Sequence, residues 1–332
     1  MIRFSKIFLY LTVAVLLVWQ LPWCYAFFTA KPVKTPFTMY SSVLGDFIFI
    51  QTDANKQIRR SDTKGNTYTQ QQVDSLLPSF YVRQLTADER FPDTICGKAV
   101  SPKDIQMTNF TFKSVPSAIN APQTGIYFLM ESMSKRVELK MPDDAFRFTG
   151  KGIEFICMET NRIDEPKSKL FTDMLLQKGF VFPASYASGN PTTRKDYDEG
   201  YLVLDANHQL FHLKCTKGCP YVKAIRLPDN VRPEYVFITE FRSRQTLGYM
   251  VDSRHHFYVI QSDGSVIKSA IPAFDPTKDE LTIFGNMFDW TVKRSTDKDD
   301  YYYALDATDY SLIKEYAYKD IRRSVPGLSF TS

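Results

Sequence analysis

The chain has 332 residues, of which 44% are hydrophobic and 14% aromatic. That is enough apolar material for one large domain or two ordinary ones, and it excludes a largely disordered chain. Forty-one basic and 37 acidic residues give a net charge of +4, with both signs scattered along the sequence. Recognition of nucleic acid would need a clustered basic surface, so we expect no nucleic-acid partner.

An uncharged, strongly apolar segment lies at the N-terminus. Two basic residues precede Ile7–Ala30, which contains no charged side chain. About 22 apolar residues that each rise ~1.5 Å would cross a ~30 Å hydrocarbon layer. Trp19 and Trp23 fall near the outer end, where amphipathic rings prefer the membrane interface. We therefore predict that residues 1–30 form a single-pass anchor or signal segment in the inner membrane, with the main domain in the periplasm.

Removal of this segment is the alternative to its retention. Cys24-Tyr25-Ala26 has small residues spaced as at a signal-peptidase site, so cleavage could follow Ala26. Retention is favoured because the aromatic side chains gather at one end of the apolar segment. Either outcome exports the rest of the chain to a compartment that permits disulfides.

A recurrent β-hairpin pattern follows a short linker at residues 31–36. An apolar strand leads to an acidic residue, then a polar turn, then a returning strand. The clearest copies are Gly200–Lys214, Gly248–Gln261 and Tyr301–Tyr316, and they recur roughly every 50 residues. The aspartates that end their first strands are Asp205, Asp252 and Asp306.

This spacing predicts an all-β fold. A period of about 45–50 residues built of short strands is what one four-stranded propeller blade supplies. We therefore expect residues 37–322 to form an irregular β-propeller-like domain, with a frayed tail at residues 323–332. The three hairpins should then occupy equivalent positions in successive sheets. A two-sheet β-sandwich made of similar hairpins is the alternative.

One helix is expected, at Lys167–Gly179. Its apolar residues recur at i, i+1, i+4 and i+5, which places them on one side of a helix. Gly179 suits the left-handed position that often follows a helix C-terminus. The apolar side should pack on the surface of a sheet.

The aspartate at the head of each hairpin turn has a structural and a functional interpretation. An Asp side chain can accept a hydrogen bond from the backbone N–H two residues on, which fixes the turn. Calcium would need several oxygen ligands at alternating positions, and the first turn offers only Asp205 and Asn207. We therefore expect a turn-fixing role, and we predict neither a metal nor a cofactor.

The segment from His208 to Cys219 holds two of the four histidines and two of the five cysteines. Along a strand, His212 and Cys215 point to opposite faces, while His208 lies at the hairpin tip. These four side chains are therefore not expected to form one tetrahedral metal site. In an exported protein the favoured prediction is a Cys215–Cys219 disulfide that closes a small loop. Free or otherwise paired thiols and a metal site are the alternatives.

Three turn residues are predicted to form a binding surface. Alignment of the two clearest hairpins matches His208 with His255, and the third hairpin offers Asp309 at the corresponding place. Equivalent turns of successive propeller blades emerge on one face, so these three side chains should line a shared polar surface. Solvated turns without a binding role are the alternative.

The sequence contains none of the common catalytic motifs. G-x-S-x-G, H-E-x-x-H, G-x-x-x-x-G-K-[ST] and G-x-G-x-x-G are all absent. We therefore predict no catalytic residue and favour a membrane-anchored binding or accessory module, with an integral-membrane protein, for example of a transport complex, as its partner. The alternative is an exported carbohydrate hydrolase, because two carboxylates that meet only in space leave no motif.

The chain resembles a family of bacterial proteins of unknown function that carry one N-terminal membrane segment. The resemblance lies in Lys34–Phe47, Phe180–Thr192 and Gly200–Lys214, together with the LPWCYAFF end of the apolar segment. It covers nearly the whole chain. It implies the single-pass topology and assigns no activity.

Overall fold

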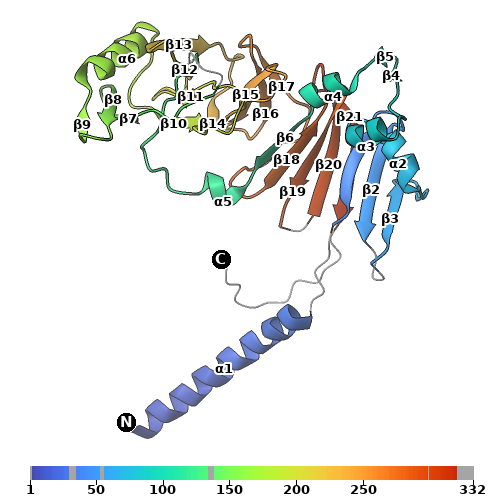
Figure 1. Ribbon diagram of the computed structural model, residues 1–332. Coiled ribbons are helices and arrows are strands. Elements are labelled where there is room, and N and C mark those ends of the chain that lie inside the picture. The colour runs from blue at the N-terminus through green and yellow to red at the C-terminus, as the bar shows by residue number, and fades with distance from the viewer. Residues whose placement is uncertain (1, 30–34, 53–55, 134–137, 298, 320–332) are drawn as a thin grey trace.

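The computed structural model describes residues 2–29, 35–52, 56–133, 138–297 and 299–319. It shows one long N-terminal helix and a domain of small antiparallel sheets with short helices (Figure 1). Of the predicted linker only residues 35 and 36 are described, and the predicted tail at 323–332 lies outside the described residues.

The first helix is the longest. Its residues Arg3–Tyr25 are long and apolar enough to cross a membrane, and none of them is buried in the structure. One N-terminal helix is thus apolar enough to be a membrane anchor or a signal peptide. The helices are α1 (Ile2–Thr29), α2 (Gln70–Leu76), α3 (Val82–Ala87), α4 (Pro102–Thr108), α5 (Pro116–Ile119) and α6 (Glu165–Gln177).

The predicted internal helix is confirmed as α6, which begins and ends two residues earlier than expected. Asp164 caps it by accepting the N–H of Lys167 at 3.0 Å. Gly179 has the expected left-handed conformation, with φ +85°. Phe171 and Leu175 are buried, so the helix packs its apolar side inward as predicted.

The strands form six antiparallel sheets within the described residues. Sheet I contains β1 (Phe37–Ser41), β2 (Asp46–Thr52) and β3 (Ile58–Asp62), and sheet II contains β7 (Asp144–Phe148), β8 (Ile153–Cys157) and β9 (Arg162–Ile163). Sheet III contains β10 (Tyr186–Gly189), β11 (Tyr201–Leu204), β12 (Leu210–Thr216) and β13 (Cys219–Ile225).

Two more sheets and a short ribbon complete the domain. Sheet IV contains β14 (Pro233–Ile238), β15 (Thr246–Asp252), β16 (Phe257–Gln261) and β17 (Val266–Lys268). Sheet V contains β18 (Glu280–Gly285), β19 (Asp289–Ser295), β20 (Asp299–Asp306) and β21 (Leu312–Lys319), with β6 (Phe110–Ser114) beside β18. The ribbon pairs β4 (Thr94–Ile95) with β5 (Lys98–Ala99).

The sheets pack face to face in succession. In β11, Val203 points into a core shared with sheet II and α6, whereas Leu202 and Leu204 point into a core shared with sheet IV. Sheet IV packs its other face on sheet V, and sheet V packs its other face on sheet I. An inner strand therefore needs apolar residues on both faces, and β15 is buried at all seven positions.

Helices cover the two ends of this stack. Val73 and Leu77, at α2, pack against Met39 and Ile48 of sheet I. At the other end, α6 packs its buried residues into the core between sheets II and III. The mostly β fold is thus confirmed, and its several small sheets do not match a two-sheet sandwich.

Two of the three predicted hairpins occupy equivalent positions. β11–β12 and β15–β16 are each the central pair of a four-stranded sheet. The third hairpin is β20–β21, which is the outer pair of sheet V, so it is displaced by one strand from the expected position. The reason is that the turn pattern belongs to tight hairpins in general and not to one position in the sheet.

The recurring aspartates fix their turns, as predicted. In Asp62, Asp205 and Asp252, one carboxylate oxygen accepts the backbone N–H groups two and four residues on, at 2.8–2.9 Å. Asp306 accepts only the N–H two residues on, at 2.7 Å, in a turn that is one residue longer. A carboxylate is used because it satisfies two N–H groups that no strand partner reaches.

We expect the loss of a buried turn carboxylate to be costly. Asp252 is 2% exposed and also accepts hydrogen bonds from His256 Nδ1 and Tyr258 Oη. Asp252→Ala should lower the free energy of unfolding by about 2–4 kcal/mol, because several donors lose their acceptor. Asp306→Ala, with one backbone donor, should cost about 1 kcal/mol. Urea titration of the full chain in detergent measures both, and equal losses would contradict this.

A second buried carboxylate makes stability depend on pH. Asp289 begins β19, where it contacts Asn286 and Ser42 at the junction of sheets V and I. Burial raises the pKa of Asp289 to about 6, whereas an unfolded Asp titrates near 4. The folded state therefore binds the proton more tightly, so this residue's contribution to stability increases as pH falls from about 7 to 4.

We expect Asp289→Asn to remove this dependence. The variant should be more stable than the parent at pH 7, by on the order of 2 kcal/mol. The difference should shrink as pH falls to 4 and vanish below it, where the parent residue is protonated in both states. Thermal unfolding at several pH values measures it. The exposed Asp309→Asn is the control, and a gain there of the same size would contradict the assignment to burial.

Candidate functional site

A groove, formed by five adjoining clefts, crosses one end of the sheets. In order, its sections are an outer section of about 510 Å³, a neck of about 140 Å³, a middle section of about 540 Å³, an aromatic section of about 320 Å³ and an end section of about 450 Å³. Neighbouring sections share lining residues, so the five clefts adjoin one another along this end of the sheets, and together they are called the groove. The outer section and the neck share Tyr197, Glu199, Lys214, Tyr221 and Arg244. The neck and the middle section share Thr246 and Ser262, and the middle and aromatic sections share Phe110 and Asn286. The aromatic and end sections share Phe80 and Asn109.

The antiparallel order of the strands explains why these residues meet. In a four-stranded meander the first and third connections emerge at one end and the second at the other. In sheets III and IV the first connections supply Glu199 and Arg244, and the third connection of sheet IV supplies Ser262. The first connection of sheet V supplies Asn286. The groove is thus built from these connections together with side chains of β12 and β13, among them His212, Lys214 and Lys223.

A buried ion cluster beside the outer section joins the first connection of sheet III to the first connection of sheet IV. Lys195 Nζ lies 2.7 Å from an oxygen of Asp198 and 2.6 Å from an oxygen of Glu240. The three side chains are 6%, 3% and 2% exposed, respectively. Burial raises the pKa of Glu240, and the ammonium of Lys195 opposes that shift. This cluster stabilises the loops, because each charge has an opposite partner at hydrogen-bond distance.

The neck contains a second polar group, centred on Glu199. Its carboxylate lies 2.9 Å from Lys214 Nζ and 3.4 Å from His212 Nε2. His212 Nε2 is also 2.7 Å from the backbone oxygen of Glu199, which accepts its proton. Burial lowers the pKa of His212, so the ring is neutral near pH 7.

The aromatic section has a different chemistry. Phe80, Phe110 and Phe284 line it together with Met39. Phe110 stacks on Phe241, with ring centroids 4.3 Å apart. The groove therefore changes from a polar to an aromatic lining along its length.

Sequence reasoning missed the groove residues. Arg244 lies in a short basic run that is typical of a solvated turn, and Tyr197 and Glu199 lie in a loop without a motif. The assigned hairpins could have predicted which loops meet, because the first and third connections of a four-stranded meander lie at the same end of the sheet.

The predicted binding residues do not share one surface. His208 Nδ1 lies 2.9 Å from the backbone oxygen of Pro233. Pro233 pairs with Asp252, which is the residue that begins the His255 turn. The His208 and His255 turns therefore lie at the same end of the sheets. Asp309 lies in a turn that borders the middle section beside Ser262, at the other end of β16 from His255. Asp309 is displaced because its hairpin is the outer pair of its sheet.

The two candidate cysteines are separate free thiols. The ladder pairs Thr216 with Cys219, so these two side chains share a face of the hairpin, and that of Cys215 points to the other face. Cys215 is buried against Glu131, whereas Cys219 is exposed. The predicted disulfide does not fit this geometry, because the two Cβ atoms must point toward each other.

The candidate metal ligands of this segment are also dispersed. His208 lies at a turn, His212 lies in the neck, and the two cysteines point to opposite faces. Over the residues that the structure describes, no group of three or more His, Cys, Asp or Glu side chains could hold a metal ion.

We expect the two cysteines to differ in reactivity. Burial raises the pKa of Cys215 to about 12, so a thiol reagent should modify it only after denaturation. Cys219 should react in the folded protein, as should Cys96, which is also exposed. Mass spectrometry of protein from its native compartment measures this. An unreduced peptide with Cys215 joined to Cys219 would show that the register argument is wrong.

Comparisons with solved structures give only distant similarities. PorZ, described as an essential bacterial surface component of the type-IX secretion system of Porphyromonas gingivalis, is 10% identical with a TM-score of 0.27, over 87% of this chain and 32% of PorZ. The WD40 domain of SCAP from fission yeast is 9% identical with a TM-score of 0.32, over 87% and 75%. The dihydro-heme d1 dehydrogenase NirN is 10% identical with a TM-score of 0.27, over 75% and 64%.

Scores this low do not define a shared fold, and this chain spans about a third of PorZ. No curated protein gives a significant match. The sequence profile of one family matches residues 37–305, from the first strand to the last residues of β20. That match covers most of the chain, and the protein therefore belongs to the family described as domain of unknown function DUF4857.

Proposed function

We propose that the protein is a membrane-anchored module that binds a partner in the groove. The observation that carries this is the row of five adjoining clefts, which runs from sheet III to α3 and α4. The sections hold about 140 to 540 Å³ each, and their lining changes from polar to aromatic along the row. Such a surface suits an extended polypeptide better than one compact ligand.

The fold proposed for the domain is an irregular β-propeller. Successive four-stranded meanders that pack face to face, with like connections at one end, are arranged as propeller blades are. Sheets III and IV have this form, sheet V adds β6 to such a meander, and sheets I and II have three strands each. The groove would then lie on a propeller face, which is a usual position for a binding site.

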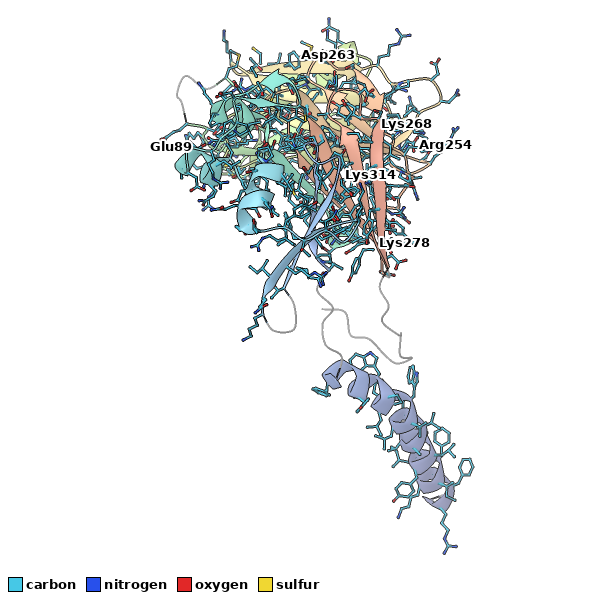
Figure 2. The ribbon with its side chains drawn as sticks, turned by 90° about the vertical axis from the view of Figure 1, so that its right-hand side faces the viewer. Glu89, Arg254, Asp263, Lys268, Lys278 and Lys314 are labelled. Atoms are coloured by element: carbon cyan, nitrogen blue, oxygen red, sulfur yellow. The ribbon has the colours of Figure 1, made fainter. Side chains whose placement is uncertain are left out.

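The two halves of the groove lie differently relative to α1. The ring of Phe37, which begins β1 just after the linker, lies 5.3 Å from that of Phe80, so the aromatic section lies beside the point where the chain enters the domain. Figure 2 shows Asp263, which lines the middle section, at the far side of the domain from α1. In this proposal α1 spans the inner membrane of a bacterium and the domain stands in the periplasm.

The proposed partner is an integral-membrane protein, such as a component of a transport complex. An anchor keeps the domain near the membrane, which raises its effective concentration toward partners in the same bilayer. The groove then receives a segment that such a partner extends beyond the membrane surface.

The carbohydrate hydrolase is the less supported alternative. Two carboxylates beside the groove, those of Asp198 and Glu240, lie close enough to share one ammonium. A glycosidase needs its acid and its nucleophile or base to reach the sugar. Asp198 borders the outer section, but both carboxylates are at most 3% exposed and are held by Lys195 at 2.6–2.7 Å, so neither is free to act on a sugar.

The test is recovery of the partner from native membranes in mild detergent. Arg244→Glu and Phe80→Asp change two exposed groove residues, and both should reduce recovery at least tenfold. Arg254→Glu and Leu176→Asp are matched controls on exposed positions outside the groove and should retain the partner.

Two other outcomes would overturn the proposal. Loss of the partner on His255→Ala, with the groove variants unaffected, would place binding at the opposite end of the sheets. Turnover of a glycan by the purified chain, abolished by a single Asp or Glu substitution, would establish the hydrolase.

A further inference from the structure

We propose that the neck of the groove is an anion subsite that takes a carboxylate or phosphate group of the ligand. That the group belongs to the groove's ligand rests on the proposed function. The binding of an anion in the neck rests on the neck's own geometry and charge.

The neck has the size of a small chemical group. Its volume of about 140 Å³ is the smallest of the five sections. Pockets for drug-sized ligands run from about 300 to 1,000 Å³. The neck therefore suits one terminal group or a small free anion, while the wider sections on either side hold the rest of a longer ligand.

Basic side chains outnumber acidic ones in the neck. Lys214, Lys223 and Arg244 line it, and Glu199 is its one carboxylate. Glu199 is engaged by Lys214 at 2.9 Å. The carboxylate of Asp263 lies close enough to Lys223 to interact with it, so the neck's own side chains carry an excess of one positive charge. Glu240 of the adjoining ion cluster accepts the N–H of Glu199 at 2.8 Å, and the second carboxylate of that cluster offsets part of this excess.

Lys223 is held in place with donors to spare. Its Nζ donates to the backbone oxygen of Asp263 at 2.7 Å, and an ammonium has three donors. Gly264 makes room for it, because a Cβ at that position would lie 2.8 Å from Lys223 Nζ. A side chain at Gly264 would thus displace the ammonium from the neck.

Arg244 is likewise oriented without being neutralised. Its guanidinium lies over the ring of Tyr197, 4.3 Å from the centroid, and Tyr197 is fixed by a 2.7 Å hydrogen bond to the backbone oxygen of Phe241. In the described part of the chain the Arg244 guanidinium forms no ion pair. A stacked guanidinium keeps its edge N–H groups free for an oxyanion, which it binds in bidentate form.

His212 lines the neck as an uncharged ring and adds no positive charge to it. Its Nε2 proton goes to the backbone oxygen of Glu199, 2.7 Å away. Burial lowers the pKa of His212, so the two nearby lysines and Arg244 set the charge of the neck at pH 7. The neck should therefore discriminate by charge: an anion binds and an uncharged molecule of the same shape does not.

The test uses the full chain in an uncharged detergent at low ionic strength. Inorganic phosphate, acetate and the uncharged acetamide are titrated and followed by ligand-observed NMR and calorimetry. We expect binding of at least one anion and none of acetamide. Whether phosphate or acetate binds more tightly identifies the group that the ligand presents.

Matched variants test the assignment to the neck. Lys223→Met and Arg244→Met should each weaken anion binding about tenfold or more, because each removes a charge-assisted donor. Lys268→Met and Arg254→Met are the controls and should stay within twofold. Figure 2 shows Lys268 and Arg254 on a different side of the domain from Asp263, which neighbours the neck.

Three outcomes would overturn the subsite: no binding of either anion, acetamide binding as tight as that of acetate, or equal losses in the neck and control variants. Unchanged thermal unfolding of the variants excludes a general loss of structure. The partner assay separates the two proposals. If Phe80→Asp abolishes partner recovery but no anion binds, the groove function stands and the subsite fails.

Discussion

The structure depends on one constraint, which is that each inner sheet must bury both of its faces. β15 satisfies it with seven buried residues, and the cores on its two sides bind sheet IV to sheets III and V. Strands under this constraint have little room for polar side chains. Polar side chains therefore lie in the connections and on outer strands such as β13, which carries Lys223. The turn aspartates allow connections to be short because they satisfy backbone N–H groups locally.

The antiparallel order then decides which connections meet. First and third connections gather at one end and form the groove, while the second connections, with His208 and His255, emerge at the other. The two ends differ in how the connections are secured. Those at the His208 end are tight turns closed by one aspartate. At the groove end the first connections of sheets III and IV are longer loops, at 190–200 and 239–245, and the ion cluster of Lys195, Asp198 and Glu240 joins them.

Local chemistry explains what the sequence could predict. The hairpins, the helix α6 and the turn-fixing role of Asp205 depend on residues close in sequence, and all three are confirmed. The disulfide depends on register, since one residue decides whether Cys215 and Cys219 share a face. The groove depends on connections from three sheets that are distant in sequence. Asp309 was misplaced because its turn looks alike in a central and an outer hairpin.

The basic residues near the groove are of two kinds, and only one kind can bind a ligand. Lys195 is buried and has two carboxylates at hydrogen-bond distance, so its charge is already paired inside the fold. Lys223 and Arg244 are exposed, and they are oriented by a backbone oxygen and by an aromatic ring. The carboxylate of Asp263 interacts with Lys223, whereas Arg244 forms no ion pair among the described residues. Exposed cations that are oriented in this way can attract an oxyanion from outside the fold, which is why the neck, and not the buried cluster, is the place to expect a ligand.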